Sequence, residues 1–252
     1  MRVVVPSKGR SQTIRKHTLA LFPDATVLVD EAEADEYAKV VDAGSLLTHA
    51  GLTPVVRILN WVLDNVHDDV VVIVDDDVTA LVAMVGWRPR RYHEPDVARQ
   101  VLESAAQCTI DAGLGLFGFN QNLNPLYFQE PFLLSRWVGG VIGFVGDHGL
   151  RYDENCALHE DADLALQALL RHRVIWCENR WHFEALRFTN PGGNTGYRTA
   201  AREAEERAYL KAKWGRYISF TEQTMHHARK ARGIDAATTV MTGLRVPRRQ
   251  LA

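Results

Sequence analysis

The stretch that most constrains the fold is Val70-Val-Val-Ile-Val74, which is followed directly by three carboxylates, Asp75, Asp76 and Asp77. A continuous run of β-branched residues is typical of a strand that is buried on both faces in the middle of a parallel sheet. The carboxyl ends of such strands form the edge at which open α/β sheets bind ligands. The sequence therefore predicts an α/β fold with this acidic triplet at the ligand-binding edge of the sheet.

The acidic triplet has two interpretations. Three like charges at one strand end raise the energy of the protein unless a cation neutralises them. Carboxylate oxygens suit Mg²⁺ or Mn²⁺, and such an ion commonly shares its coordination shell with a diphosphate. The alternative is an acidic turn that caps a helix beginning at Val78, because Asp is favoured at helix N-termini.

Length and charge favour one α/β domain with a tail. The chain has 252 residues, of which 46% are hydrophobic, and a formal net charge of −2. A charge so near zero excludes a global basic field that would hold nucleic acid, although basic residues cluster within 88–91, 171–173 and 229–249. We expect a single domain over residues 1–220 and a basic C-terminal tail over residues 221–252.

Cysteine usage and hydropathy bear on the cellular compartment. The three cysteines are an odd number without metal-ligand spacing, which fits reduced thiols. No apolar run approaches membrane-spanning length, and the N-terminus opens on a strand rather than on a signal sequence. We therefore expect a cytoplasmic protein without a membrane partner.

Expected strands and helices alternate along the chain, which is typical of a Rossmann-like, mostly parallel sheet flanked by helices. Glycines within residues 137–145 further predict a close approach of the backbone to a ligand or to a neighbouring segment. Apolar patterning predicts strands over residues 2–5, 25–29, 70–74, 114–119, 137–145 and 174–177, and helices over residues 11–21, 32–40, 55–64, 97–112, 164–171 and 202–214.

The first strands of the predicted sheet bring polar side chains to the same edge. The first strand ends at Pro6, and the polar turn from Ser7 to Arg10 presents backbone N–H groups and a guanidinium to a phosphate or a base. The second strand ends at Asp30, and Arg57 lies on the polar side of the next long helix. An ordinary strand–helix loop is the alternative for the Ser7 turn, because the chain has no Gly-rich phosphate motif there.

Three features later in the chain are candidates for chemistry. Glu160 and Asp161 open a helix, where they are either a general base for an acceptor hydroxyl or ordinary acids favoured by the helix dipole. His182 lies just after an expected strand and is either a metal ligand or a packed structural residue. The Gly/Asn-rich loop over residues 188–198, with Arg198 at its end, is either a mobile lid or a plain surface loop.

In their order and spacing these motifs resemble the GT-A class of nucleotide-sugar glycosyltransferases. The similarity covers roughly residues 1–215 and includes Val5-Pro-Ser-Lys-Gly-Arg10, the stretch from Gly51 to Arg57 before the acidic strand, and Gly139-Gly140 followed by Glu160-Asp161. The resemblance implies a GT-A fold, a nucleotide-sugar donor and a Mg²⁺ or Mn²⁺ ion. The residues that it implies for the donor are Pro6, Ser7, Arg10, Asp30, Arg57, Asp75, Asp76, Gly139, Gly140 and Arg198, and those for the metal are Asp75, Asp77 and His182.

Within this class the chain is most similar to the TET-associated glycosyltransferases of phage and bacterial DNA-modification systems. The motifs of this likeness are Val-Pro-Ser-x-Gly-Arg at the start, Arg57-x-x-x-Trp61, Gly192-Gly-x-x-x-Tyr-Arg198 and Lys213-Trp-Gly215. The resemblance implies transfer of a sugar from a UDP-sugar to 5-hydroxymethylcytosine, or a related hydroxymethylpyrimidine, in DNA. It also implies inversion with Asp161 as the base beside Glu160, and, for a phage-encoded protein, action in the host cytoplasm.

Three other functions stay open from the sequence. A GT-A glycosyltransferase could act on a glycan or a small molecule instead of DNA. A nucleotidyltransferase would also use a carboxylate-bound metal, but it would need a Gly-rich loop with a lysine, which Lys8-Gly-Arg10 provides only in part. A non-catalytic nucleic-acid-binding module would use the basic tail, but three carboxylates repel phosphate unless a metal intervenes.

Overall fold

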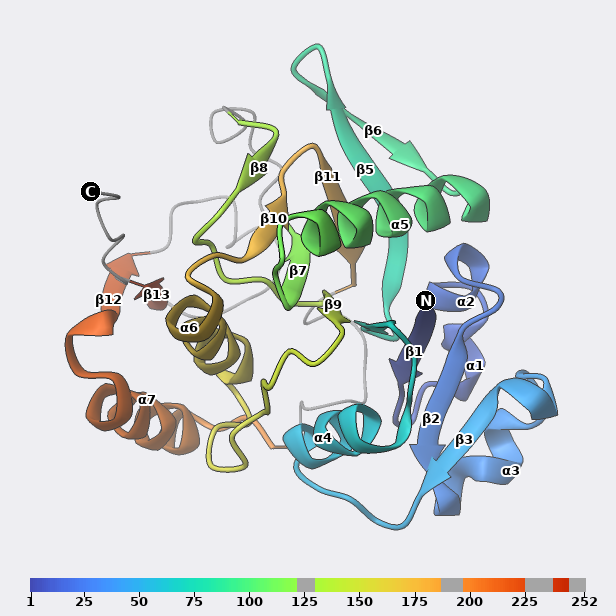
Figure 1. The fold of residues 1–252 in the computed structure, drawn as a ribbon. Coiled ribbons are helices and arrows are strands. Elements are labelled where there is room, and N and C mark those ends of the chain that lie inside the picture. The colour runs from blue at the N-terminus through green and yellow to red at the C-terminus, as the bar shows by residue number, and fades with distance from the viewer. Residues whose placement is uncertain (122–129, 187–196, 225–237, 245–252) are drawn as a thin grey trace.

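A large sheet forms the centre of the molecule (Figure 1). The computed structural model describes residues 1–121, 130–186, 197–224 and 238–244. The strand order is β3-β2-β1-β4-β9-β7-β10-β8, in which β1 to β4 are parallel, β9 is antiparallel to both its neighbours, and β10 is parallel to β7. The strands are β1 (Arg2–Pro6), β2 (Thr26–Asp30), β3 (Leu46–His49), β4 (Val70–Val74), β7 (Leu116–Phe119), β8 (Phe132–Leu133), β9 (Val141–Val145) and β10 (Trp176–Glu178).

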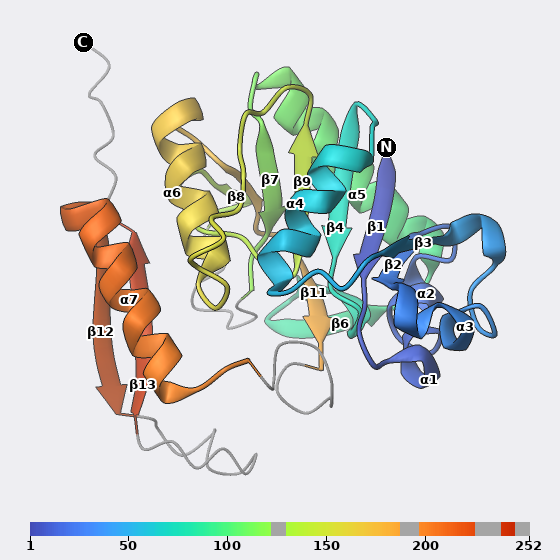
Figure 2. The same ribbon diagram turned by 90° about the horizontal axis from the view of Figure 1, so that it is seen from below.

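Helices cover both faces of this sheet (Figure 2). One face is covered by α1 (Ser11–Ile14), α2 (Thr18–Leu21) and α5 (Pro95–Asp111), and the other by α4 (Val55–Asn65) and α6 (Glu160–His172). The short elements η1 (Glu31–Glu33), α3 (Ala34–Tyr37) and η2 (Ala43–Ser45) lie between β2 and β3 in the chain. The predicted α/β fold with a mostly parallel sheet is confirmed.

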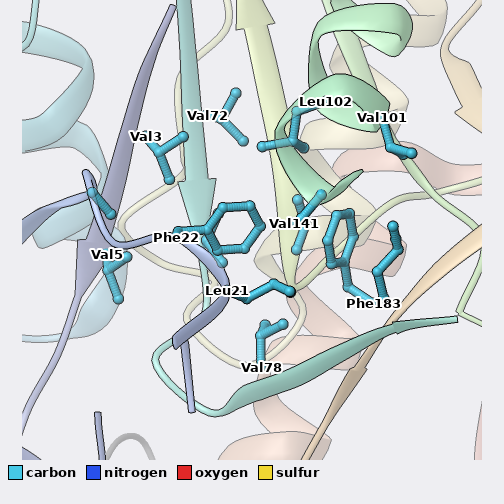
Figure 3. Packing of buried hydrophobic residues seen from close by; sticks show 14 of the residues in the cluster. Val3, Val5, Leu21, Phe22, Val72, Val78, Val101, Leu102, Val141 and Phe183 are labelled. Carbon is cyan, nitrogen blue, oxygen red and sulfur yellow. The ribbon is translucent and has the colours of Figure 1, made fainter. Parts of the chain in front are cut away.

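Strand β4 is the centre of the core, as its sequence predicts. All five of its residues are buried, and successive side chains of a strand point to opposite faces. Val70, Val72 and Val74 therefore pack against the α5 face, whereas Val71 and Ile73 pack against α4 and α6. Figure 3 shows Val72 in this packing. Complete burial of one such side chain stabilises the fold by about 1.5–3 kcal/mol.

A second, smaller sheet lies at the carboxyl end of β4. It has the order β11-β5-β6 and consists of β11 (Trp181–Ala185), β5 (Val78–Val85) and β6 (Arg88–Tyr92). Strand β5 starts directly after the acidic triplet, so the alternative interpretation, an acidic turn that caps a helix from Val78, is wrong. The β-branched residues Val78 and Thr79 favour a strand, and β5 pairs with β11 in an antiparallel register. His182 follows β10 in the chain, as expected, and lies within β11.

The C-terminal region packs on α6. It consists of α7 (Ala200–Trp214), η5 (Gly215–Tyr217) and the antiparallel pair β12 (Ile218–Thr224) and β13 (Thr238–Leu244). Leu210 and Ile218 are fully buried against Leu166 of α6. Strand β12 runs across the expected boundary between residues 220 and 221, and the division into a domain and a tail remains a prediction.

Several expected elements differ in length from those of the structure. The helix expected over residues 11–21 is broken into α1 and α2 at His17, whose φ and ψ are −108° and −105°. The helix expected over 32–40 is reduced to η1 and α3, and the strand expected over 137–145 begins at Val141. None of the helices within the described residues is long and apolar enough to cross a membrane.

Candidate active site

The acidic triplet lies at the carboxyl end of β4, where the sequence places it, but its three side chains have different surroundings. Asp75 is exposed, whereas Asp76 and Asp77 are only 5% and 6% exposed. The turn is held from α2, because the Thr18 hydroxyl donates to the Asp75 carbonyl (2.8 Å) and accepts from the Val78 N–H (3.0 Å). Only the first carboxylate of the triplet is therefore presented to a ligand.

Arg10 binds the two buried carboxylates. Its Nη1 donates to Oδ1 of Asp76 and lies 3.3 Å from Oδ2 of Asp77. A ring of hydrogen bonds surrounds this pair: Ser7 Oγ donates to Asp76 Oδ2 (2.5 Å) and lies 2.7 Å from the Tyr37 hydroxyl, which accepts from the Arg10 backbone N–H (2.9 Å). The turn after β1, the helix α3 and the acidic triplet are thus tied into one unit.

Burial dominates the electrostatics of this ring. It raises the pKa of Asp76 above its ordinary value, although the Arg10 charge and the Ser7 hydroxyl act in the opposite direction. Burial also raises the pKa of Tyr37. Arg10 therefore counters the effect of burial and favours the charged form of Asp76.

The segment just before the neighbouring strand β9 connects Asp75 with the carboxylates at the start of α6. The Asp75 N–H donates to the Gly140 carbonyl (2.8 Å), just before β9. A Cβ placed on Gly139 would lie 2.1 Å from Asp161 Oδ2. The predicted close approach of this glycine-containing segment is therefore confirmed, and its neighbour is the side chain that is the expected general base. The structure thus brings Asp75, Gly139, Gly140 and Asp161 together.

Glu160 shares this environment. Loss of solvation raises its pKa well above the ordinary value, and the negative charges of Asp161 and Asp75 add to the effect. The same three carboxylates act on the buried Tyr152, whose pKa is raised by burial and then by their charges. A carboxyl group whose pKa is raised in this way releases its proton at a higher pH than usual, which brings its titration closer to the pH at which a general acid or base operates.

A pocket lies beside these groups. It is lined by Asn120, Gln121, Gly139, Gly140 and His182 together with apolar side chains of β5 and β11. His182 Nδ1 is 2.5 Å from the Asn120 carbonyl. Because a carbonyl only accepts, Nδ1 donates, and the neutral ring then carries its lone pair on Nε2, which is the tautomer that a metal ligand requires.

The three expected metal ligands do not form a metal-binding group by themselves. Across the described ranges, no three His, Cys, Asp or Glu side chains are arranged to hold a metal ion. Asp77 lies against Arg10, and Asp75 is on the exposed side of the turn. Mg²⁺ is, however, usually bound through one or two carboxylates, substrate phosphates and water, so a site at Asp75 fits a divalent ion that arrives with a diphosphate.

The remaining predicted residues have other placements. Asp30 lies at the same sheet edge, caps η1 through the Ala32 N–H (3.0 Å) and has His49 Nδ1 at 4.0 Å. Arg57 is 53% exposed and forms an ion pair with Glu154. Pro6 ends β1. Their contacts with a donor stay predictions.

Arg198 lies on the α6 side, since its charge acts on Glu160, and it forms an ion pair with Glu203 of α7. The expected lid falls largely on residues 187–196, which lie outside the described residues. Contact of Arg198 with a donor also stays a prediction.

Some residues of the site had no signal in the sequence. Tyr37, Asn120 and Gln121 belong to no motif of the sequence, because the contacts that give them a role cross from one element to another. Asn60 of α4 is a further example: its side chain donates to the Tyr152 carbonyl (2.9 Å) and accepts from the Tyr152 N–H (3.0 Å). A polar residue in the apolar stripe of a helix is the one sequence feature that points to such a contact.

Comparison with known proteins supports the fold. No protein-family model matches the chain, and no curated protein is similar to it. Among solved structures, glucosyl-3-phosphoglycerate synthase from Mycobacterium tuberculosis in complex with Mg²⁺ and UDP has a TM-score of 0.54 at 12% identity, over 96% of this chain and 86% of that one. The mannosyltransferase PcManGT from Pyrobaculum calidifontis in complex with GDP-Man and Mn²⁺ has a TM-score of 0.53 at 16% identity, over 85% of this chain and 64% of that one.

The chain has the GT-A fold. It spans less than two thirds of the mannosyltransferase, and 58% of S. aureus TarS 1–349, to which its TM-score is 0.46. At these identities the likeness defines the architecture of the GT-A domain and not its substrates.

Proposed function

We propose that this GT-A protein is a glycosyltransferase that uses a nucleoside-diphosphate sugar and a divalent metal ion. The observation that carries the proposal is the meeting of exposed Asp75, at the end of the central strand, with Asp161 on the adjacent Gly139. Both carboxylates lie at the sheet edge where α/β folds bind ligands. Complexes of similar folds with GDP-Man and Mn²⁺, and with UDP and Mg²⁺, support the choice of donor and metal.

The donor lies, in this proposal, along the carboxyl ends of β1, β2 and β4. The turn from Pro6 to Arg10 contacts the nucleotide, and Asp30 contacts the nucleoside. Asp75 holds Mg²⁺ or Mn²⁺ together with the diphosphate, and His182 is a second expected ligand. Asp77, the third expected ligand, is buried beside Arg10 and is not part of this proposal. Such an ion, when bound, supplies the positive charge that stabilises the departing diphosphate.

Asp161 is the proposed general base. Inversion requires one carboxylate within hydrogen-bond reach of the acceptor hydroxyl, on the side opposite to the leaving group. Asp161 lies against Gly139, next to the strand that carries Asp75, and Glu160 precedes it in the chain. Because of this contact we assign the proton transfer to Asp161.

For the acceptor we propose a hydroxymethylpyrimidine in DNA, such as 5-hydroxymethylcytosine. Besides the resemblance, the hairpin of β5 and β6 supports this choice, because it projects from the body of the molecule (Figure 1). At its tip Trp87 is 74% exposed and has a φ of +68°, which is unusual for a bulky residue. Exposed Arg88 and Arg90 follow on one face of β6, while Arg91 is paired with Glu184.

The geometry of the hairpin suits a nucleic acid. Strand β5 has eight residues, so at about 3.3 Å per residue it spans about 25 Å from the acidic triplet. This distance corresponds to about seven base-pair steps. In this arrangement the arginines contact phosphates and the exposed tryptophan stacks on a base. The base that reacts must be flipped out of a duplex, or lie in a single strand, to reach the pocket.

The test is a transfer assay. Protein and Mn²⁺ are mixed with UDP-sugars or GDP-sugars and with oligonucleotides that carry either cytosine or 5-hydroxymethylcytosine, and the strands are weighed by mass spectrometry. A mass gain of one sugar on the hydroxymethylated strand only is the expected result. Transfer to a glycan or a small hydroxyl compound instead would contradict the DNA acceptor and leave the glycosyltransferase standing. Absence of both transfer and metal-dependent donor hydrolysis would contradict the activity itself.

A further inference from the structure

Helix α7 contacts the segment of residues 153–163 both before and after Glu160 and Asp161 in the chain. These contacts are at Asp153, at the Leu158 backbone and at Asp163, so the two carboxylates of the site lie between the fixed points. The N-cap residue of α6, His159, accepts backbone hydrogen bonds with its carbonyl but makes no capping hydrogen bond with its side chain. Contacts from outside the helix therefore add to the local support of this first turn.

Among the three positions, Asp163 accepts the largest number of side-chain hydrogen bonds. It is completely buried, and its Oδ1 accepts from Lys213 Nζ (2.7 Å) and from Trp214 Nε1 (2.7 Å), while Oδ2 accepts from Gln167 (2.7 Å). Asp161 and Asp163 are two residues apart, so they point about 200° apart around the helix axis. One therefore faces Gly139 and the site, and the other faces α7.

Lys213 also fixes the start of the segment. Its Nζ lies 2.6 Å from Asp153 Oδ2, which also accepts from the Tyr209 hydroxyl (2.6 Å). Partial burial opposes ionisation of Asp153, but the hydrogen bonds from Lys213 and Tyr209 lower its pKa to about 2. Between these points the buried Glu206 accepts from the Leu158 N–H (2.7 Å).

We propose that Lys213 and Trp214 are positioning residues, which set the rotation of the first turn of α6 and so hold Asp161 on Gly139. This inference rests on the proposed function, because it concerns the general base of that reaction. A rotation of the first turn would move both Asp161 and Asp163, and the two hydrogen bonds from Lys213 and Trp214 of α7 to the buried Asp163 resist it. A displacement of about 1 Å at a reacting group lowers a rate by about 10²-fold.

The experiment compares Lys213→Met and Trp214→Phe with Lys211→Met. Lys211 lies in the same helix, but its Nζ binds the Gly215 and Ile218 carbonyls (2.8 and 2.9 Å) and does not contact the segment. Trp214→Phe retains the aromatic packing and removes only the N–H donor. We expect kcat to fall about 10²-fold in Lys213→Met and about 10-fold in Trp214→Phe, with an unchanged KM for the donor. Lys213→Arg, which can still reach both carboxylates, is expected to restore most of kcat.

Hydrogen exchange supplies a readout that does not depend on activity. The Ala162 and Asp163 amides bond to the His159 carbonyl (3.1 and 3.2 Å), and we expect them to exchange at least 10-fold faster in Lys213→Met and Trp214→Phe than in Lys211→Met. Equal exchange in all three variants, or faster exchange with unchanged kcat, would overturn the inference. If the wild-type protein turned over no donor, the proposed function would fail, whereas exchange would still decide whether α7 fixes this turn.

Discussion

The carboxylate of Asp161 lies so close to the α-carbon of Gly139 that a Cβ at this position would be 2.1 Å from Oδ2. This contact joins the acceptor side of the site to the donor side, because the next residue, Gly140, accepts the backbone hydrogen bond of Asp75 (2.8 Å). The glycine is therefore required by a side chain that approaches it and not by its own backbone conformation.

Gly139→Ala should displace Asp161 and reduce activity. The added methyl group has no room, so we expect a loss of about 1–3 kcal/mol in the free energy of unfolding and a fall in kcat of about 10²-fold. Gly44→Ala is the matched control, because a Cβ there meets no atom within 4 Å. Urea denaturation and steady-state kinetics measure both effects. Equal behaviour of the two variants would show that the Gly139 contact has no role.

Arg10→Met should destabilise the fold strongly. It leaves Asp76 and Asp77 buried without their cation, and removal of one partner of a buried ion pair costs about 3–5 kcal/mol. Arg57→Met breaks an exposed ion pair with Glu154 and should cost at most about 1 kcal/mol. Urea denaturation at pH 7 compares the two variants. An effect of Arg10→Met no larger than that of Arg57→Met would contradict the structural role of the ring.

Glu160→Gln should make the protein more stable at neutral pH. Because loss of solvation, Asp161 and Asp75 raise the pKa of Glu160 in the folded state, ionisation of this group opposes folding. The penalty is absent below the ordinary pKa of 4.5 and grows as the pH rises toward the folded-state value. The melting temperature of Glu160→Gln should therefore equal that of the wild type near pH 4 and exceed it at pH 8. The exposed Glu36→Gln serves as control, and a difference that shrinks with rising pH would contradict the assignment.

Arg88→Ala/Arg90→Ala should weaken binding to a DNA oligonucleotide and reduce its dependence on salt. Loss of two phosphate contacts lowers the slope of log K against log salt by about 1.4 for single strands and about 1.8 for duplex DNA. Arg2→Ala/Arg151→Ala removes the same charge away from the hairpin. Fluorescence anisotropy over a salt series measures the slopes. Equal slopes for the two double variants would exclude the hairpin from the DNA contact.

The sequence predicts the parts of this molecule that depend on local pattern. Strand β4 and its position in the core follow from five successive β-branched residues, and α4 follows from its apolar spacing. The acidic triplet could be placed at the correct sheet edge for the same reason. Its division into one exposed and two buried carboxylates could not, because Arg10 lies more than sixty residues away in the chain.

The C-terminal contacts show the same limit. Lys213-Trp-Gly215 could be recognised as a motif, whereas Asp163 belongs to no motif of the sequence. Their hydrogen bonds in the interior are a consequence of how α7 packs on α6, for which no local pattern exists. Helix α1 and helix α2 were expected as one helix, since periodicity does not report the break at His17.

The most direct test of the account is calorimetry of nucleoside-diphosphate binding with and without Mn²⁺. Asp75→Asn changes the exposed carboxylate at the carboxyl end of β4, and Asp69→Asn changes an exposed carboxylate just before the amino end of the same strand. The account predicts Mn²⁺-dependent binding of UDP or GDP to the wild type and to Asp69→Asn. In Asp75→Asn it predicts binding at least 10-fold weaker, which corresponds to a loss of at least about 1.4 kcal/mol in binding free energy. Wild-type binding that needs no metal, or equal affinities of the two variants, would contradict it.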